Sequence, residues 1–357
     1  MQPLSLKLNP HNAARWCGCP AYPRFAETVE AVDTDEKREG VAAGWLAEQV
    51  LRGVAPDCKS LVGQSHQNGW LIENGMAVLI QDYVDLVKGY GDFAIELEVS
   101  FSDQPEISGR IDAVNTGRVL RVHELKYGRT IVDVFENEPL IIYAGSMFRN
   151  YDMTGVELIQ LSVFQPRSHH TKGIHRKWTL NYDELQGYCA DILVKANRCL
   201  DPKSPAIPGP WCLHCEVGAK CEALTHTNYK FIDRVLSNNQ RSMSPEELSK
   251  ELKYLRYVDK IFTSRKKAVE AEALARANDT FIPDFQIEHG QGKRKFTTDP
   301  LTIEILTGHK INLEKPTTPA ALEKMGVSKK IVNAFSTQPR LPGKLVEYVK
   351  EHNDVDI

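Results

Sequence analysis

The stretch that decides the fold runs from residue 94 to residue 128. It holds three blocks, Ala94-Ile-Glu-Leu-Glu-Val-Ser-Phe101, Ile107-Ser-Gly-Arg-Ile-Asp-Ala-Val114 and Arg118-Val-Leu-Arg-Val-His-Glu-Leu-Lys-Tyr-Gly128. Each block alternates apolar, often β-branched residues with polar ones, and Asn115-Thr-Gly117 supplies turn residues before the last block. The pattern predicts three successive strands of an antiparallel meander.

Charged side chains gather at the end of this meander. Because side chains alternate across a strand, Glu124 and Lys126 are expected on one face, and Asp112 can lie beside them if the preceding strand pairs there. The two carboxylates and the Leu125 carbonyl form an oxygen site that suits Mg²⁺ or Mn²⁺. A lysine close to a metal-bound water can orient that water or neutralise charge on a phosphate, which is the chemistry of phosphodiester hydrolysis. Taken alone, the same residues are also typical of a surface ion pair.

The elements around the meander predict an α/β fold with a mixed central sheet. Helical spacing of apolar residues predicts helices at 35–53 and 76–87, before the meander. A further helix is expected from Pro139 to Met147, since proline is tolerated in a first turn, followed by an apolar strand at 156–165.

Length and composition set outer bounds on the function. The 357 residues suggest two domains or one enlarged domain. The net charge of −3 argues against a protein that coats nucleic acid by bulk positive charge, so any nucleic-acid contact must be local. No stretch is apolar enough to span a membrane, and Met1 to Pro10 lacks the layout of a secretory signal. A cytoplasmic protein is expected.

Eight cysteines in a reducing compartment are unlikely to form a disulfide framework, so their spacing matters. Cys212, Cys215 and Cys221 lie close together after a run rich in proline, and two thiolates separated by two residues can reach one metal centre from a tight turn. A fourth ligand must come from elsewhere; Cys19, before Pro20, is preferred over Cys17. The spacing favours an iron–sulfur cluster over a zinc knuckle by only about two to one.

The remaining cysteines are not expected to bind a metal. Cys189 and Cys199 fall at helical spacing on the apolar face of a predicted helix at 181–200, so both are expected in the core. Cys58 lies in a polar segment and receives no role.

The sequence, with both the Asp112, Glu124 and Lys126 group and the cysteine group, resembles a known family. Gly109-Arg-Ile-Asp112 followed by Glu124-Leu-Lys126 resembles the PD-(D/E)XK nuclease core, and three late cysteines with an early one resemble its iron–sulfur branch of the RecB and CRISPR-adaptation exonuclease type. Arg15-Trp16, Lys126-Tyr-Gly128 and Gln165-Pro-Arg167 are similar to the phage or prophage subgroup.

The resemblance implies a function and a set of site residues. It implies a metal-dependent DNA exonuclease that acts on DNA ends or single strands, with phage recombination proteins as partners and, if phage-encoded, the bacterial cytoplasm as its location. It implies Asp112 and Glu124 as ligands of Mg²⁺ or Mn²⁺, Glu98 as a less secure one, Lys126 and Tyr143 as catalytic residues, and a [4Fe–4S] cluster on Cys19, Cys212, Cys215 and Cys221.

Two positions depart from the family pattern. Gly44 stands where the family has a metal-ligating histidine, and Pro139 stands where it has a glutamine four residues before the tyrosine. A water or a neighbour such as Glu48 could replace the histidine. These departures keep a second hypothesis open, a catalytically weak or inactive DNA-binding subunit that retains the nuclease fold.

The rest of the chain predicts a helical extension and basic segments. Ser244-Pro-Glu-Glu247 is typical of a helix start, and a helical stripe follows toward Ala277. The expected division is a nuclease domain at 1–228, a helical arm at 229–280 and a small region at 281–357, with a helical tail over 316–345. The basic run from Arg167 to Lys177 is expected to supply DNA contacts, through Arg167, Arg176 and Lys177.

Overall fold

The computed structural model describes residues 7–29, 33–213, 215–236, 244–277, 279–292, 294–297, 300–309 and 318–347. The chain divides into two compact units, Met1–Arg265 and Lys266–Ile357. The boundary between these units falls within helix α8 (Pro245–Arg276). The division expected from the sequence, after residues 228 and 280, stays a prediction. Helix α7 (Glu222–Leu236) belongs to the first unit, because its Leu224 is buried together with Cys212 and with Ile261 of α8.

A mixed five-stranded sheet of order β1-β2-β3-β4-β5 forms the centre of the first unit. Strands β1 (Phe93–Phe101), β2 (Gln104–Asn115) and β3 (Val119–Leu125) pair antiparallel, which confirms the predicted meander. Strand β4 (Leu158–Phe164) is parallel to β3, because the chain crosses over through helix α5 (Glu138–Asn150). Strand β5 (His175–Leu180), in part of the basic run, was not predicted; it pairs antiparallel with β4.

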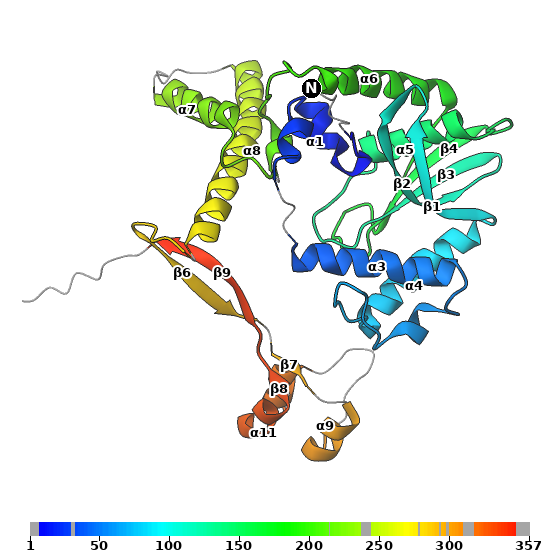
Figure 1. Cartoon of the computed structure of the whole chain (residues 1–357). Helices are drawn as coiled ribbons and strands as arrows, with labels where there is room; N and C mark the ends of the chain where they lie inside the picture. Colours follow the sequence, from blue (N-terminus) through cyan, green and yellow to red (C-terminus); the bar gives the residue numbers. More distant parts are fainter. Residues whose placement is uncertain are drawn as a thin grey trace, which may run out of the picture. The chain divides into compact units, whose positions relative to one another are not determined.

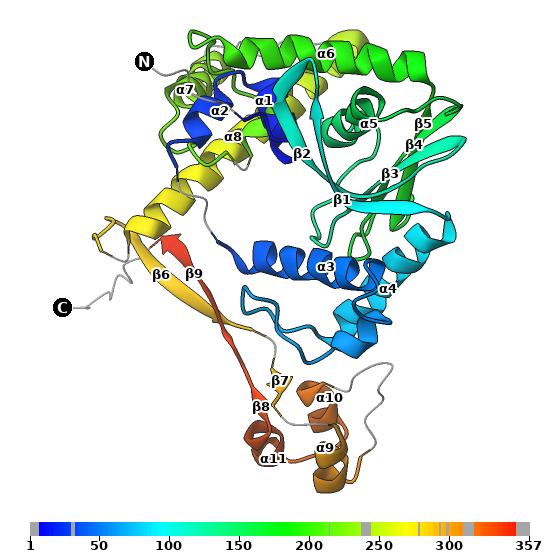
Figure 2. The same cartoon turned by 45° about the vertical axis from the view of Figure 1, so that its right-hand side comes forward.

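Helices cover both faces of this sheet, as Figure 1 shows. Helix α5 and, beyond it, α6 (Tyr182–Leu200) lie on one face, and α3 (Asp35–Leu51) and α4 (Asn74–Gly89) lie on the other (Figure 2). Each face has its own apolar core. The helices expected before and after the meander are therefore confirmed, and the α/β architecture with a mixed sheet with them.

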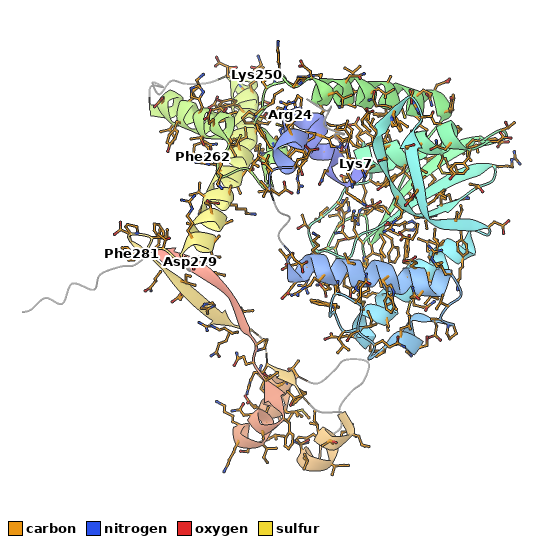
Figure 3. The ribbon with its side chains drawn as sticks, in the orientation of Figure 1. Lys7, Arg24, Lys250, Phe262, Asp279 and Phe281 are labelled. Atoms are coloured by element: carbon orange, nitrogen blue, oxygen red, sulfur yellow. The ribbon has the colours of Figure 1, made fainter. Side chains whose placement is uncertain are left out.

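The N-terminal segment connects distant parts of the first unit. Leu8 N donates to the Glu106 carbonyl of β2 at 2.8 Å, and the chain continues through η1 (Pro10–Asn12), α1 (Ala13–Gly18) and α2 (Tyr22–Ala26). The Arg24 guanidinium donates to the carbonyls of Asp201 and Ser204 at 2.8 and 2.6 Å (Figure 3). The segment thus joins the sheet to the region just before the cysteine motif.

Cysteines outside the motif are part of the core. Cys189 and Cys199 are buried with exposed fractions of 0% and 1%, which confirms the prediction. Cys58 begins a short 3-10 turn, η2 (Cys58–Leu61), and is fully buried against α3 and α4. Its polar sequence context gave no sign of this burial.

The second unit combines strands and short helices. Strand β6 (Phe285–Gln291) pairs with β9 (Arg340–Glu347), and β7 (Lys295–Phe296) with β8 (Ser336–Thr337). Helices α9 (Pro300–Thr307), α10 (Pro319–Lys324) and α11 (Lys329–Ala334) share a small core of Ile303, Leu322 and Val332. The predicted helical tail is wrong in its second half, which pairs as β8 and β9; residues 316 and 317 lie outside the described ranges.

The start of α8 follows the sequence prediction. Glu247 N donates to Ser244 Oγ at 3.3 Å, and Ser244 N donates to Glu247 Oε2 at 3.0 Å, which is a capping box. Within the described part of the chain, no helix is long and apolar enough to cross a membrane.

Candidate active site

The structure brings Asp112, Glu124 and Lys126 together at the carboxyl end of β3. Leu125 N donates a hydrogen bond to Asp112 Oδ2 at 2.8 Å, and Lys126 Nζ forms an ion pair with Glu124 Oε1. Lys126 N donates to the Phe164 carbonyl at 2.9 Å, so β3 is held against β4 beyond its last paired residue. The three side chains named from the sequence therefore occupy one site.

The three charged side chains of this site shift one another's pKa values. Burial raises the pKa of Asp112, and the Glu124 carboxylate raises it further, while Lys126 acts in the opposite direction. Burial acts against the charge of Lys126, but Glu124 and Asp112 together raise the pKa of its ammonium. When both carboxyls are ionised, they exceed the one ammonium in charge, and a divalent cation would offset that excess.

Glu124 is the clearest sign of a missing partner. Its side chain is 2% exposed, and among the described residues neither of its oxygens has a hydrogen-bond partner of ordinary geometry. Lys126 and, at 3.7 Å, His11 Nδ1 approach only Oε1, as ion-pair partners. A buried carboxylate oxygen without a partner is costly, so a group that binds it is expected.

The site opens into a cavity of about 700 Å³. Helix α3 supplies one wall and α4 contributes Tyr83; Asp112, Leu125 and Lys126 supply the other side. The Tyr83 hydroxyl and that of the predicted Tyr143 are both buried without a hydrogen-bond partner in the described chain. Burial raises the pKa values of both phenols, and the nearby Asp112 and Glu124 carboxylates raise them further.

The acidic residue contributed by β1 is Glu96 and not Glu98. Between the pairs Ile95–Ala113 and Leu97–Ile111, Glu96 falls opposite Asp112, and it lines the cavity. Its φ of 49° breaks the extended backbone, and the carboxylate forms an ion pair with Arg110 at 2.5 Å. Glu98 is exposed and lines a separate hollow. Glu96 and Glu98 are two residues apart, so side-chain alternation along the strand places both on the same face. Only the strand register shows which of them lies beside Asp112.

Two histidines that the sequence did not single out line the same cavity. His11 comes from η1 and packs edge-on against the Tyr143 ring at 6.3 Å, and burial lowers its pKa. His66 lies in the loop before α4, with its ring 5.5 Å from that of Trp45, and its Nδ1 accepts a hydrogen bond from Asn68 N. Neither residue lies in a periodic pattern, so only the tertiary structure reveals them.

The residues present fit a magnesium-type ion bound with several waters. Among the described residues, no three His, Cys, Asp or Glu side chains are grouped closely enough to hold an ion by themselves. Mg²⁺ keeps several waters and is usually held by one or two carboxylates. Asp112, Glu124 and the Leu125 carbonyl would therefore be enough protein ligands for it. The unpaired Glu124 oxygen supplies the specific reason to expect such an ion.

A second candidate site lies between the N-terminal segment and the cysteine motif. One small cavity of about 20 Å³ is lined by the four predicted ligands Cys19, Cys212, Cys215 and Cys221, whereas Cys17 does not line it. Every one of the four sulfur atoms accepts a backbone N–H: Ile207 N to Cys19 and Gly209 N to Cys212, both at 3.4 Å, Leu224 N to Cys221 at 3.5 Å, and Val217 N to Cys215. Such N–H donors stabilise thiolate charge and accompany cluster-bound cysteines.

Trp211 closes this cysteine cavity. A Cβ at Gly18 or Gly209 would lie 2.2 or 2.4 Å from the Trp211 ring, so both positions require glycine for this packing. The indole N–H donates to the Ile207 carbonyl at 2.7 Å. Burial raises the pKa of the Cys212 thiol to about 11 and also raises that of Cys215. Buried thiols of this kind become ligands only when a metal offsets the cost of their charge.

The predicted DNA-contacting residues differ in their environments. Arg176 is 2% exposed and donates to the carbonyls of Val132 and Gly173, to Gln165 Oε1 and to Ser168 Oγ, so it is a structural residue and not a DNA contact. Arg167 forms an ion pair with Glu39 at 2.6 Å and lies over the ring of Tyr127, which lines the active-site cavity. Lys177 donates to the Tyr90 hydroxyl at 2.7 Å and does not line that cavity.

Comparison with known families gives a match over nearly the whole chain. A family described as "Protein of unknown function (DUF2800)" matches residues 6–346. The chain belongs to the DUF2800 family. This match includes both the carboxylate site and the four cysteines that line the second cavity.

Two solved structures are distantly similar to this DUF2800 chain. A crystal structure of a protein from Eubacterium rectale named "Putative exonuclease" has 10% identity and a TM-score of 0.37, covering 68% of this chain and 93% of the other. The protein SSO0001 has 16% identity and a TM-score of 0.29, covering 61% of this chain and 87% of the other.

Gly44 and Pro139 take defined places in the DUF2800 chain. Gly44 lines the active-site cavity from α3, and a Cβ at this position would meet no atom within 4 Å. Glu48, suggested from the sequence as a substitute, lines the same wall and forms an ion pair with Arg52 at 2.8 Å. Pro139 occupies the first turn of α5 after the Asn137 cap, as its fixed backbone geometry favours.

Proposed function

We propose that this DUF2800 protein is a divalent-metal-dependent deoxyribonuclease that acts on DNA ends or single strands. The observation that carries the proposal is the buried Glu124 carboxylate, with an oxygen that lacks any hydrogen-bond partner in the described chain, beside Asp112 and Lys126. Asp112, Glu124 and the Leu125 carbonyl would hold Mg²⁺ or Mn²⁺, with Glu96 and His11 next to them.

The chain's own residues have separable roles in this proposal. A bound metal ion would lower the pKa of a water molecule and draw charge from a phosphate oxygen. Lys126, kept protonated by the two carboxylates, would orient the attacking water or offset charge that develops on the phosphate. The Tyr143 hydroxyl, buried and without a hydrogen-bond partner in the described structure, is available to donate to the substrate or to a water in the site.

The competing hypothesis of an inactive DNA-binding subunit rests on Gly44 and Pro139. His11 and His66 line the cavity that Gly44 leaves open, so imidazole donors are available without a ligand from α3. His11 approaches Glu124, and its lowered pKa keeps the ring neutral, which is the form that binds metals. These observations favour catalysis over a silent nuclease fold.

We propose further that Cys19, Cys212, Cys215 and Cys221 hold a structural [4Fe–4S] cluster. The four backbone N–H donors to the sulfur atoms, and the small, mainly apolar cavity that all four cysteines line, support this assignment. From the sequence resemblance we also expect a role in phage or prophage recombination, with recombination proteins as partners.

The test of the nuclease proposal is degradation of end-labelled linear DNA with Mg²⁺ or Mn²⁺. We expect cleavage by the wild-type protein and none after addition of a chelator. Binding of DNA ends without cleavage under any divalent metal would favour the inactive subunit instead.

A further inference from the structure

A second hollow adjoins the active-site cavity on the other side of His11 and Arg110, which line both. Its volume of about 800 Å³ is that of a small-molecule binding site. Beyond the two shared residues, polar side chains from the N-terminal segment, the β1–β2 hairpin and the end of α5 line it: Lys7, Asn9, Glu98, Ser100, Ser108, Asn150 and Tyr151. No role assigned above uses this hollow.

The N-terminal segment and the hairpin form the floor of the hollow. Leu8 N is bound to the Glu106 carbonyl at 2.8 Å, which holds Lys7 beside β2; Figure 3 labels Lys7 where the described chain begins. A Cβ at Gly109 would lie 2.8 Å from Pro10, so only glycine permits this close approach. The floor is therefore fixed by the same contacts that bring His11 to Glu124.

Helix α5 extends from the active site to the far end of the hollow. Tyr143 is fully buried beside the site, whereas Arg149 donates to Asp103 at 2.8 Å at the hairpin turn. Eight residues separate Tyr143 from Tyr151, or about 12 Å along a helix axis. That distance equals about three to four base spacings of a stacked DNA strand, at 3.4 Å each.

Tyr151 offers an aromatic surface at this far end. Its backbone is fixed, because Tyr151 N donates to the Met147 carbonyl at 3.0 Å and Asn150 Oδ1 accepts from Ser100 N at 3.3 Å. The side chain is 41% exposed, and no ring contact to it occurs among the described aromatic pairs. An exposed ring on a fixed backbone, next to hydroxyl and amide groups, suits an unpaired base, since any base can stack on it.

The charge of the hollow favours a strand held by stacking more than by phosphate contacts. Lys7 brings one ammonium, which has no ion-pair partner among the described residues. Arg110 is already bound to Glu96 at 2.5 Å, and Glu98 adds a negative charge. A duplex binder would need many more cations along its groove. A lining with one cation and an exposed aromatic ring therefore suits an unpaired strand better than double-stranded DNA.

We propose that this hollow binds the unpaired nucleotides of a single DNA strand next to the scissile phosphate, with a base stacked on Tyr151 and a phosphate near Lys7. The proposal rests on the nuclease function proposed above and adds its substrate form. Tyr151 and Lys7 take no part in the proposed metal binding.

The test is binding of fluorescein-labelled single-stranded DNA to the full chain, measured by anisotropy without divalent metal. Tyr151→Ala is expected to weaken binding about ten-fold, while Tyr151→Phe, which keeps the ring, stays within about two-fold of wild type. Tyr229→Ala on α7, which removes a 63% exposed tyrosine, is the matched control and should change nothing. Lys7→Ala should make the slope of log affinity against log salt shallower by about 0.7.

Equal binding by Tyr151→Ala and Tyr229→Ala would overturn the proposal, as would equal losses of affinity for single-stranded and blunt duplex DNA.

The nuclease proposal and the proposal for the hollow fail in different ways. If the wild-type protein neither binds nor cleaves DNA with Mg²⁺ or Mn²⁺, the nuclease function is wrong. If it cleaves DNA and both Tyr151→Ala and Lys7→Ala keep wild-type binding, only the hollow is misassigned. A small phosphodiester such as bis(p-nitrophenyl) phosphate cannot reach Tyr151, so its hydrolysis should be the same in Tyr151→Ala and wild type.

Discussion

Asp112 Oδ2 accepts a hydrogen bond from the backbone N–H of Leu125 at 2.8 Å. This bond joins the last part of β2 to the end of β3 and fixes one proposed ligand against the residue whose carbonyl is another. Because Glu124 and Lys126 flank Leu125, the same bond sets the positions of all three predicted side chains. The geometry of the candidate active site therefore follows from the register of two neighbouring strands.

Lys126→Ala should abolish most DNA cleavage while the protein remains folded. Loss of one charged group that stabilises a transition state typically costs about 10² to 10³ in rate. The measurement is the rate of linear DNA degradation at saturating Mn²⁺, with circular dichroism as the check of folding. Lys59→Ala, a change in the surface turn η2, is the control. A Lys126→Ala rate within a few-fold of wild type would remove Lys126 from the mechanism.

Asp112→Asn should stabilise the metal-free protein at neutral and higher pH. The pKa of Asp112 is raised in the folded state, so the folded protein binds a proton more tightly than the unfolded chain does. Stability of the metal-free protein therefore falls as pH rises from the unfolded pKa of about 3.9 through the raised value, and asparagine removes this loss. Since one pKa unit is about 1.4 kcal/mol, the gain should be at least about 1 kcal/mol.

Urea unfolding of both proteins in EDTA, at pH 5 and pH 8.5, measures this difference. The gain should be larger at pH 8.5, and Mn²⁺ should stabilise only the wild type strongly. A variant that is less stable than wild type at pH 8.5 would contradict the raised pKa of Asp112.

Cys215→Ser should remove the cluster, and Cys17→Ser should not. Cys215 lines the cysteine cavity with three other thiols, whereas Cys17 lies outside it. Anaerobically purified wild type and Cys17→Ser should contain iron and absorb broadly at about 400 nm, as thiolate-bound clusters do. Colourless wild-type protein with stoichiometric zinc would reverse the assignment. Cluster loss should also lower the free energy of unfolding by several kcal/mol, because the motif closes a long loop to Cys19.

Arg176→Met should destabilise the fold without a direct effect on DNA contacts. The buried guanidinium satisfies the carbonyls of Val132 and Gly173 and the side chain of Gln165, which also binds the loop after Lys126 through Gly128 and Thr130. Unpaired buried acceptors should cost about 2–4 kcal/mol in the free energy of unfolding. Lys177→Met, on the same strand, should cost less than about 1 kcal/mol. Equal stability of the two variants would contradict the buried role of Arg176.

The sequence predicted those parts of the site that depend on local periodicity. Alternation placed Glu124 and Lys126 on one face, and the short turn at Asn115-Thr-Gly117 brought Asp112 beside them. Glu96 and Glu98 share that alternation, and only the φ of 49° at Glu96 and its pairing register separate them. His11 lies near Glu124 because Leu8 pairs with β2, and no local sequence pattern predicts that tertiary contact. The burial of Arg176 was missed for the same reason, since it depends on tertiary partners that include the Val132 carbonyl, 44 residues away in the sequence.

The most direct test of the account is Mn²⁺-dependent degradation of end-labelled linear DNA by wild type, Asp112→Ala and Lys126→Ala, measured side by side. The account predicts cleavage by wild type alone, with losses of about 10² or more in both variants. Equal activity of all three proteins would contradict the assignment of this site as the catalytic centre.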